Sequence, residues 1–302
     1  MGNIYLASPN KSKNTNIDES RSLIYAASEM QGWRNTMEDA HIHVCDLQAD
    51  ISIFGVFDGH GGKEVALFVE KHFLEELQKN KNFKDQKFEE ALKETFLKMD
   101  ELLITPEGQK EINQIKGGDD DVSYAGCTAN VALFHKNTLY VANAGDSRSV
   151  LCRNNTNHDM SVDHKPDNYE EKQRIERAGG FVSDGRVNGN LNLSRALGDL
   201  EYKRDNKLRT NEQLIIAVPD IKKVELTPND KFLLMGCDGV FETLDHSDLL
   251  KFINSKLGNQ PVTPQLLAKV AEDLLDHLIA PDTSAGTGCD NMTTLIIYLK
   301  GK

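Results

Sequence analysis

Three apolar segments of the chain each end at an aspartate that has a glycine beside it. The segments are ISIFGVFDG, TLYVANAGD and KFLLMGCDG, and their acids are Asp58, Asp146 and Asp238. Each segment is a short apolar run, as expected of a buried strand. One Asp-Gly pair after a strand is usually a turn signal. Three segments of the same design indicate carboxylates that gather at strand ends.

Two further segments carry their acids before a strand instead of after it. MEDAHIHV places Glu38 and Asp39 before one strand, and GCDNMTTLIIYL places Asp290 and Asn291 before another. In an antiparallel sheet the end of one strand lies beside the start of its neighbour. Acids that follow some strands and precede others are therefore expected to meet at one rim of the sheets.

The simplest case is the predicted hairpin formed by the HIHV strand and the ISIFGVF strand. If Asp46 pairs with Ile51 across the turn, Asp39 lies opposite Asp58. Glu38, Asp39 and Asp58 then converge whatever the rest of the fold is.

A cluster of carboxylates needs cations. Several carboxylates at one place repel one another, and each is costly to bury without a partner. Oxygen ligands without a set of thiolates favour Mg²⁺ or Mn²⁺ over Zn²⁺. Asp58 has two carboxylate oxygens that can bridge two ions about 3.5–4 Å apart, and Gly59 leaves its backbone carbonyl open to an ion. We therefore expect a shared two-ion site; the alternative is that each acid only ends a turn.

The elements that must position these acids are short strands and amphipathic helices. Predicted strands lie at His41–Asp46, Ile51–Asp58, Cys127–His135, Thr138–Ala144, Ser147–Arg153, Lys222–Leu226, Lys231–Cys237 and Thr293–Leu299. Residues 63–77, 87–103 and 263–279 have apolar side chains at helical spacing and are predicted helices. Because the strands follow one another in runs instead of alternating with helices, we predict an α+β fold with antiparallel sheets.

Composition restricts the class of partner and the compartment. The net charge of −12 argues against a nucleic-acid-binding surface. The chain has 5 cysteines, an odd number without a C-x-x-C pair, which favours a reducing compartment and no disulfides. No segment is apolar over the roughly 18 residues that a membrane span needs. We therefore expect a cytoplasmic or nuclear protein.

The N-terminal residues differ from the rest of the chain. Residues 1–20 are predicted to be a flexible segment, because SPNKSKNTNIDES at 8–20 is polar. Residues 21–302 are predicted to form one domain, since no linker interrupts them. Gly2 is placed as N-myristoylation requires, but Leu6 stands where the usual pattern has Ser or Thr. Membrane association is expected only if Gly2 is acylated.

Taken together, the motifs of the chain resemble those of the metal-dependent PPM/PP2C family of serine/threonine protein phosphatases. The matching stretches follow the family's order over nearly all of residues 23–299, and they are RNTMEDAH, FGVFDGHGG, GCTANVAL, VANAGDSR, DHKP, RIERAGGFV, LNLSRALGD, LLMGCDGVFE and GCDNMT. The resemblance implies a four-layer α-β-β-α sandwich, in which helices flank two central antiparallel sheets.

The same resemblance implies which residues bind metal. Two Mg²⁺ or Mn²⁺ ions and a weaker third ion are expected. The implied ligands are Asp58 as the bridge, Gly59 through its carbonyl, Asp238 and Asp290 at the second ion, Glu38 and Asp39 through waters, and Asp146 with Asp238 at the third ion.

Arg34 and His60 are the implied catalytic residues beside Asp58. Arg34 would bind the phosphate, for which a planar guanidinium with paired donors is well shaped. The alternative for Arg34 is a surface ion pair with Glu38. His60 would protonate the departing serine or threonine oxygen as a general acid. The alternative for His60 is a turn histidine bonded to the backbone.

Two further acids have roles that stay open at the level of the sequence. Glu242 stands where an aspartate is common in the family, so the presence and the absence of a third ion are both consistent with the sequence. Asp199, in SRALGD, has three alternatives: it supports the same region, caps a helix, or pairs with Arg195 or Lys203.

The predicted function is that of a protein-serine/threonine phosphatase. It would hydrolyse phosphoserine and phosphothreonine by direct attack of a water shared by two metal ions. Cations would help because a phosphomonoester dianion repels hydroxide and has a poor leaving group. Phosphorylated proteins are the expected partners, and the chain is expected to be a monomer. The alternatives are a catalytically weak or inactive pseudophosphatase scaffold and a phosphoesterase for small molecules.

Overall fold

Two antiparallel sheets form the centre of the molecule. The computed structural model describes residues 5–48, 50–118 and 123–301. One sheet has the strand order β1 (Tyr5–Glu19), β2 (Leu23–Arg34), β16 (Met292–Leu299), β15 (Asp230–Gly236), β9 (Arg148–Arg153) and β10 (Thr156–Asp159). The other has the order β14 (Asp220–Glu225), β8 (Thr138–Ala144), β7 (Ala129–His135), β4 (Ile51–Phe57) and β3 (Ala40–Gln48). All neighbouring strands in both sheets are antiparallel, as predicted.

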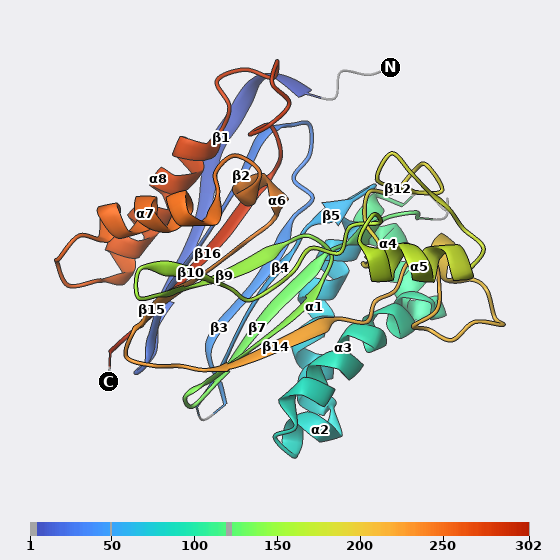
Figure 1. The fold of residues 1–302 in the computed structure, drawn as a ribbon, viewed down its shortest axis with the longest axis horizontal. Coiled ribbons are helices and arrows are strands. Elements are labelled where there is room, and N and C mark those ends of the chain that lie inside the picture. The colour runs from blue at the N-terminus through green and yellow to red at the C-terminus, as the bar shows by residue number, and fades with distance from the viewer. Residues whose placement is uncertain (1–4, 49, 119–122, 302) are drawn as a thin grey trace.

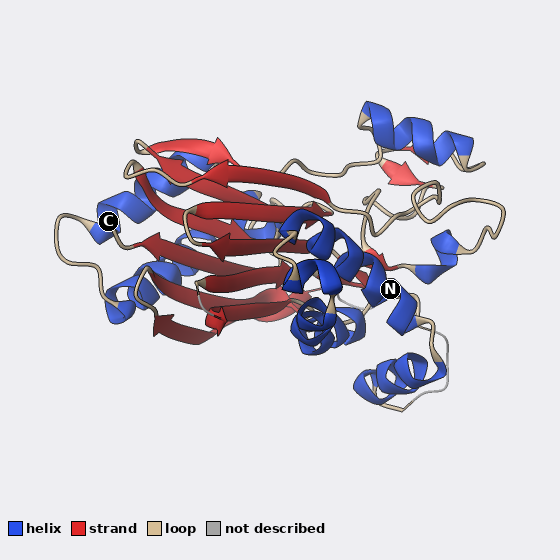
Figure 2. Ribbon diagram, turned by 90° about the horizontal axis from the view of Figure 1, so that it is seen from below, coloured by secondary structure: helices blue, strands red, loops and turns tan. Residues whose placement is uncertain are grey.

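Helices cover the outer face of each sheet (Figure 1). α7 (His246–Leu257) and α8 (Pro264–Leu278) pack on the sheet that contains β2, and α1 (Glu64–Lys79) and α3 (Phe88–Leu103) pack on the sheet that contains β4. Shorter helical elements are α2 (Lys81–Lys84), α4 (Pro106–Lys116), α5 (Tyr169–Arg177), α6 (Asp238–Phe241) and the 3₁₀ helix η1 (Leu200–Lys203). Figure 2 shows the strands together in the middle of the molecule and the helices outside them. The predicted α-β-β-α sandwich is confirmed. None of the described helices is long and apolar enough to cross a membrane.

Small elements complete the end of the sandwich where the acids lie. β5 (Gly59–His60), β6 (Gly126–Cys127) and β13 (Leu197–Gly198) form a short three-stranded sheet in the order β13-β6-β5. A separate hairpin consists of β11 (Val182–Ser183) and β12 (Arg186–Val187). The three-stranded sheet brings segments that are far apart in the sequence next to the end of β4.

The position of β4 explains its continuous apolar sequence. Ile53 and Phe57 belong to the core formed with α1 and α3, whereas Phe54 and Val56 belong to the core shared with the other sheet. All four side chains are fully buried. A strand that is covered on both faces has no solvent side, so its apolar residues do not alternate with polar ones.

The N-terminal cap of α8 and its buried apolar face are both as the sequence predicts. Thr263 Oγ1 accepts a hydrogen bond from the N–H of Leu266 (3.2 Å), and Pro264 lies in the first turn. The apolar face of the helix is buried against β2 and β16. All three predicted helices are confirmed, as α1, α3 and α8.

The register of the β3–β4 hairpin brings the predicted acids together. Ala40 pairs with Phe57, so Asp39 and Asp58 are the next pair outward. This is the pairing expected at the end of the hairpin that faces the site.

At the other end of the same hairpin the prediction is wrong. A shift in register follows Val44, and Gln48 instead of Asp46 pairs with Ile51. The extra residues form a bulge in β3, which changes the pairing at the turn only. Because the shift lies beyond Val44, it leaves the pairing at the site unchanged.

The predicted flexible segment over residues 1–20 is also wrong where the structure describes it. Residues 5–19 form β1, which pairs with β2 at the edge of the sheet. Polar side chains are typical of an edge strand, because only one of its sides is paired and its surface stays in water. Lys13 Nζ forms an ion pair with Asp276 Oδ1 on α8 (2.7 Å), which fixes the strand further. Gly2, on whose acylation membrane association would depend, lies outside the described residues.

In the described part of the chain, five α-helices were not predicted: α2, α4, α5, α6 and α7. In α4 and α5 few side chains are buried; the apolar ones that are fully buried are Ile112 in α4 and Ile175 in α5. A single buried apolar residue does not produce a helical period in the sequence. Helices such as α4 and α5 can be recognised only when their packing is known.

Candidate active site and metal centre

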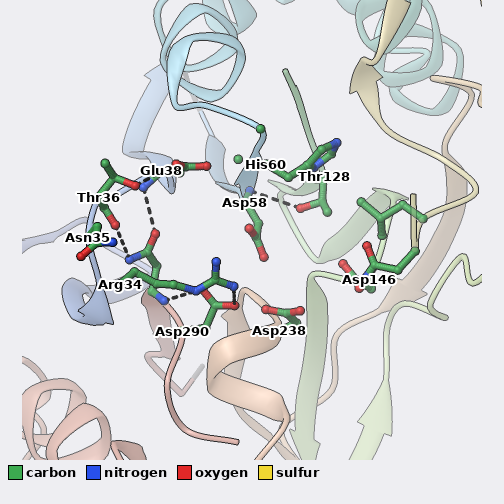
Figure 3. Close-up of a pocket in the computed structure, with 15 residues that line it drawn as sticks. Arg34, Asn35, Thr36, Glu38, Asp58, His60, Thr128, Asp146, Asp238 and Asp290 are labelled. Carbon is green, nitrogen blue, oxygen red and sulfur yellow. Dashed lines mark hydrogen bonds and ion pairs between the residues drawn. The ribbon is translucent and has the colours of Figure 1, made fainter. Parts of the chain in front are cut away.

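The predicted site residues line one cavity of about 350 Å³. They are Arg34, Glu38, Asp58, Gly59, His60, Asp146, Asp238 and Asp290. Figure 3 shows the carboxylates of Asp58, Asp146 and Asp238 pointing toward the same space. Asp39 is buried next to Asp58, outside the cavity lining. The acids that follow β4, β8 and β15 thus meet the acids that precede β3 and β16.

Thr128 fixes the end of β4. Its hydroxyl accepts a hydrogen bond from the N–H of Asp58 (3.2 Å), and its own N–H donates to the carbonyl of Asp58 (2.9 Å). Thr128 also bonds Ser147 through its hydroxyl (2.7 Å). These contacts hold the backbone of Asp58 so that its carboxylate projects into the cavity. The sequence did not assign Thr128, although it lies in the GCTANVAL motif.

Asp58 belongs to two groups of possible metal ligands. One carboxylate oxygen from each of Asp58, Asp146 and Asp238 lies within 4.8 Å of the others. The second group consists of Asp39, Asp58 and the Sγ of Cys237, again within 4.8 Å. Asp58 is therefore the acid that both groups share, as expected of a bridging ligand.

The pKa values of these acids show that their charges are not compensated. Burial, together with Asp39 and Asp238, raises the pKa of Asp58 well above its usual range. Burial and Asp146 raise the pKa of Asp238 to about 8. Burial raises the pKa of Asp39 to about 7, even though the Thr293 hydroxyl donates to its carboxylate (2.7 Å). Among the described residues, no lysine or arginine forms an ion pair with any of these three acids.

Two cations of the chain neutralise acids at the margin of the cluster. Arg34 Nη2 lies 2.5 Å from Asp290 Oδ2, so Arg34 pairs with Asp290 and not with Glu38. Lys165, from the DHKP motif, forms an ion pair with Asp146 Oδ2. The sequence did not predict either partner. The centre of the cluster, around Asp58 and Asp238, is left without a fixed positive charge.

Asn291 holds the loop that carries Arg34 and Glu38. Its Oδ1 accepts a hydrogen bond from the N–H of Glu38 (2.9 Å), and its Nδ2 donates to the carbonyls of Gln31 and Thr36 (both 2.9 Å). The Glu38 carboxylate accepts from the Thr36 hydroxyl (2.8 Å). These bonds join the loop after β2 to the start of β16.

His60 pairs with an acid from a distant segment. Its Nε2 lies 2.8 Å from Oδ2 of Asp199. Burial lowers the pKa of His60, but the Asp199 carboxylate outweighs this effect, so that the pKa is raised overall. Of the alternatives for Asp199, the structure shows the one in which it supports the region of the site: it makes no side-chain cap, Lys203 pairs with Asp100, and Arg195 pairs with Glu171 and Asp220.

Gly59 is required for a reason other than the one expected. A Cβ at this position would lie 2.3 Å from the backbone oxygen of Glu38. No side chain fits there, because β5 and the loop before β3 are in contact. Gly59 itself is one of the residues that line the cavity.

The donor atoms of the cavity fit hard divalent cations. The acids that line it are Glu38, Asp58, Asp146, Asp238 and Asp290, and carboxylate oxygens are ligands that Mg²⁺ and Mn²⁺ prefer. Burial and the neighbouring acids raise the pKa of the Cys237 thiol well above its usual range, so Cys237 stays protonated beside Asp39 and Asp58. Uncompensated buried acids and the chemistry of these donors agree with a site for cations of this class.

Glu242 uses its carboxylate in a contact with the loop before β16. Its Oε1 accepts a hydrogen bond from the N–H of Gly288 (2.7 Å). The group of acids on the Asp146 side of the cavity, in the described part of the chain, is Asp58, Asp146 and Asp238, and it does not include Glu242. The longer side chain of Glu242 thus does not complete a third set of ligands.

Comparison with known proteins identifies the family. The model of the family "Protein phosphatase 2C" matches residues 24–286 of the chain. The chain belongs to the protein phosphatase 2C family. It is 88% identical over 298 residues to a probable protein phosphatase 2C 4 of Paramecium tetraurelia, a match that covers 99% of both chains. It is 78% identical over 296 residues to protein phosphatase 2C 1 of the same organism, covering 98% of this chain and 99% of the relative.

Solved structures agree with the fold of the protein phosphatase 2C family. A phosphatase from a pathogenic strain of Toxoplasma gondii superimposes with a TM-score of 0.75 at 25% identity, covering 96% of both chains. A serine-threonine phosphatase 2C from Toxoplasma gondii has a TM-score of 0.76 at 21% identity, covering 98% of this chain and 99% of the other. The second comparison supports the fold alone, because the identity is low.

Proposed function

We propose that this member of the protein phosphatase 2C family is a serine/threonine protein phosphatase whose activity depends on Mg²⁺ or Mn²⁺. The observation that carries the proposal is the group of Asp58, Asp146 and Asp238, whose oxygens lie within 4.8 Å of one another in a cavity that Arg34 also lines. Acids this close are stable together in their charged form only with cations between them.

The ligands that we propose are those that the resemblance to the family implies, and the grouping of the acids supports the place of Asp58 among them. Asp58 would bridge two ions, because it belongs to both groups of acids. The proposed partners are Gly59 through its carbonyl at one ion, Asp238 and Asp290 at the other, Glu38 and Asp39 through waters, and Asp146 at a weaker third ion. When bound, the cations would lower the pKa of a water molecule and neutralise phosphoryl oxygens.

The side chains around the cations would bind the phosphate and move a proton. Arg34 would bind the phosphoryl oxygens with paired donors, which its position at the cavity and its fork of N–H groups support. His60 would give a proton to the departing serine or threonine oxygen, a step that helps a poor leaving group. Asn291 would keep Arg34 and Glu38 in place through the bonds it makes to their loop.

Hydrolysis of a phosphothreonine peptide tests the proposal. We expect the purified protein to need added Mn²⁺ or Mg²⁺ and to lose activity in EDTA. Asp58→Asn and Asp238→Asn should each lower kcat/KM by about 10³-fold or more, since they remove ligands of ions that supply several kcal/mol of transition-state stabilisation. Asp276→Asn is the matched control: it removes the same charge from the surface of α8 and should leave kcat/KM unchanged.

The other outcomes separate the alternative functions. Full activity in EDTA would contradict metal dependence. Tight binding of Mn²⁺ without any hydrolysis would indicate a pseudophosphatase scaffold. Hydrolysis of small phosphoesters but not of the peptide would indicate a phosphoesterase for small molecules.

We further propose that the protein acts as a monomer on phosphorylated proteins in the cytoplasm or nucleus. All five cysteines are free and buried, which suits a reducing compartment. The proposed catalytic domain includes β1, because this strand belongs to the sheet that carries β16. Light scattering after gel filtration tests the oligomeric state, and Gly2→Ala in a fluorescent fusion tests whether acylation moves the protein to membranes.

A further inference from the structure

We propose that Asp199 is a positioning residue that orients His60 for proton donation to the leaving oxygen. This proposal rests on the phosphatase function proposed above. It concerns one contact, between Oδ2 of Asp199 and Nε2 of His60, at 2.8 Å. The contact joins residues that are 139 positions apart in the sequence.

The contact engages one of the two ring nitrogens of His60. Nε2 of His60 is directed to a carboxylate whose side chain is only 2% exposed. The imidazole itself is 25% exposed and lines the cavity. With Nε2 held by Asp199, Nδ1 is the nitrogen left to donate. In the proposed step, the proton on Nδ1 moves to the alkoxide oxygen as its bond to phosphorus breaks, and the neutral ring keeps its proton on Nε2.

The backbone beside the pair is a glycine that leaves space for both side chains. In the short sheet β13-β6-β5, Gly126 pairs with His60 on one side and with Gly198 on the other. A Cβ on Gly126 would lie 2.3 Å from Oδ2 of Asp199 and 2.7 Å from Nε2 of His60. The space that a side chain would fill at this glycine is therefore occupied by the histidine and its acid.

The backbone of Asp199 is held in an unfavourable conformation. Its φ of 48° and ψ of 40° lie in the left-handed region, which residues other than glycine rarely adopt. The N–H of Asp199 donates to the carbonyl of Ala125 (3.1 Å), and its carbonyl accepts from the N–H of Tyr202 (3.0 Å). Strain of this kind persists only where the surroundings impose it, and it is common at functional sites.

A second, partly buried acid holds the segment that carries Asp199. Asp100 on α3 accepts from the N–H of Gly198 (2.8 Å) and pairs with Nζ of Lys203 (2.6 Å). Lys203 also donates to the carbonyl of Ala196 (2.8 Å). Lys203 is thus engaged by Asp100, and the carboxylate of Asp199 contacts His60.

The leaving group of the substrate tests the proposal kinetically. A phosphothreonine peptide has an alkoxide leaving group that needs a proton, whereas p-nitrophenyl phosphate has one that needs little. We expect Asp199→Asn to lower kcat on the peptide on the order of 10- to 100-fold and kcat on p-nitrophenyl phosphate by less than about 3-fold. His60→Gln should show the same selectivity, and the double variant should lose no more than His60→Gln alone.

Two further variants distinguish positioning from a loss of folding. Asp230→Asn is the matched control, because Asp230 is equally buried but pairs with Arg153 at the other end of β15. It should lower the melting temperature without changing the ratio of the two substrates. Gly126→Ala leaves Asp199 in the chain but displaces the pair, and it should reproduce the selective loss. Equal losses on both substrates in Asp199→Asn, or additive losses in the double variant, would overturn the proposal.

Nuclear magnetic resonance can detect the contact between Asp199 and His60 without any measurement of activity. In protein with ¹⁵N-labelled histidine and Mg²⁺, we expect the His60 resonances to show a proton on Nε2, and Asp199→Asn to remove this preference. The same protonation pattern in both proteins would contradict the proposed role. If the wild-type protein hydrolysed neither substrate, the phosphatase function and the proton donation by His60 would be rejected, while the spectra would still decide whether Asp199 orients the ring.

Discussion

Two groups of buried acids in this molecule have opposite environments. Around the cavity, burial and mutual repulsion raise the pKa of Asp58 well above its usual range and that of Asp238 to about 8. In α5, burial alone would raise the pKa of Glu171, but Arg195 and Arg174 lower it to about 2. The comparison shows that an acid with a structural role is paired with arginine side chains. The acids at the centre of the site have no lysine or arginine partner among the described residues.

The contacts account for the difference. Arg174 Nη1 lies 2.6 Å from Glu171 Oε2, and Arg195 Nη2 lies 2.7 Å from Glu171 Oε1. Arg195 also pairs with Asp220 (2.7 Å). The hydrogen bond with His164 and the charge of Arg195 lower the pKa of Asp220. A carboxylate with two arginines is stable in its charged form at neutral pH. The acids around Asp58 reach that state only when mobile cations join them.

Removal of an acid from the cavity should have the largest effect on activity and a small effect on folding. Asp58→Asn should reduce hydrolysis of a phosphothreonine peptide by about 10³-fold or more. Without divalent ions its free energy of unfolding should equal or exceed that of the wild type, because a repelling charge is gone. Mn²⁺ at 100 times its Kd should stabilise the wild type by about 2.7 kcal/mol and the variant by much less. Chemical denaturation with and without Mn²⁺ measures this, and a variant clearly less stable without ions would contradict the comparison.

Removal of the acid between two arginines should mainly reduce stability. Glu171→Gln leaves Arg174 and Arg195 without their shared partner, and we expect the free energy of unfolding to fall by about 3 kcal/mol. The control is Glu170→Gln, since Glu170 is exposed on the same turn and should change stability by less than about 0.5 kcal/mol. Similar denaturation midpoints for the two variants would show that the pair with the arginines is not stabilising.

Acid should remove the contribution of Glu171. The folded-state pKa is depressed from 4.5 to about 2, so the contribution is complete above the unfolded pKa and is lost as the pH falls through the folded one. We expect the stability difference between the wild type and Glu171→Gln to be constant above about pH 5 and to shrink between about pH 4.5 and 2. Urea denaturation at a series of pH values checks this window. A difference that grew toward low pH would have the wrong sign for a depressed pKa.

The smallest effect is expected for Lys165, whose ion pair with Asp146 lies between the uncompensated acids and the rest of the protein. Lys165 is the fixed cation of Asp146, and Lys165→Gln would make this acid resemble Asp58. We expect divalent ions to bind about 2- to 5-fold more tightly on the Asp146 side, since a half-exposed ion pair contributes at most about 1 kcal/mol. Isothermal titration calorimetry with Mn²⁺ measures the affinity, and Lys136→Gln, at an exposed turn, is the control. Unchanged or weaker binding in Lys165→Gln would show that the lysine does not compete with a cation.

Much of the candidate site was predictable because the strands and the acids at their ends can be recognised from short stretches of the sequence. The apolar runs that end at Asp58, Asp146 and Asp238 predicted strands, and the antiparallel arrangement predicted that Asp39 would meet Asp58. The flexible N-terminal segment was predicted wrongly, because the polar side chains of β1 say nothing about its backbone hydrogen bonds to β2.

The cations and orienting residues of the site were not predictable in the same way. Arg34 and Asp290 are 256 positions apart, and His60 and Asp199 are 139 positions apart. Such contacts depend on how the two sheets and the short β13-β6-β5 sheet pack on one another. No local period in the sequence encodes that packing.

The sequence by itself determined the strands that end at the acids, the helices α1, α3 and α8, and the N-terminal cap of α8. These features depend on short-range preferences of the backbone and on apolar periodicity. Only the tertiary structure decided which acids receive an arginine or lysine and which remain uncompensated. The reason is that Coulomb interactions depend on distance and the cost of burying a charge depends on the whole surroundings of the group, and both are set by segments that are distant in the chain.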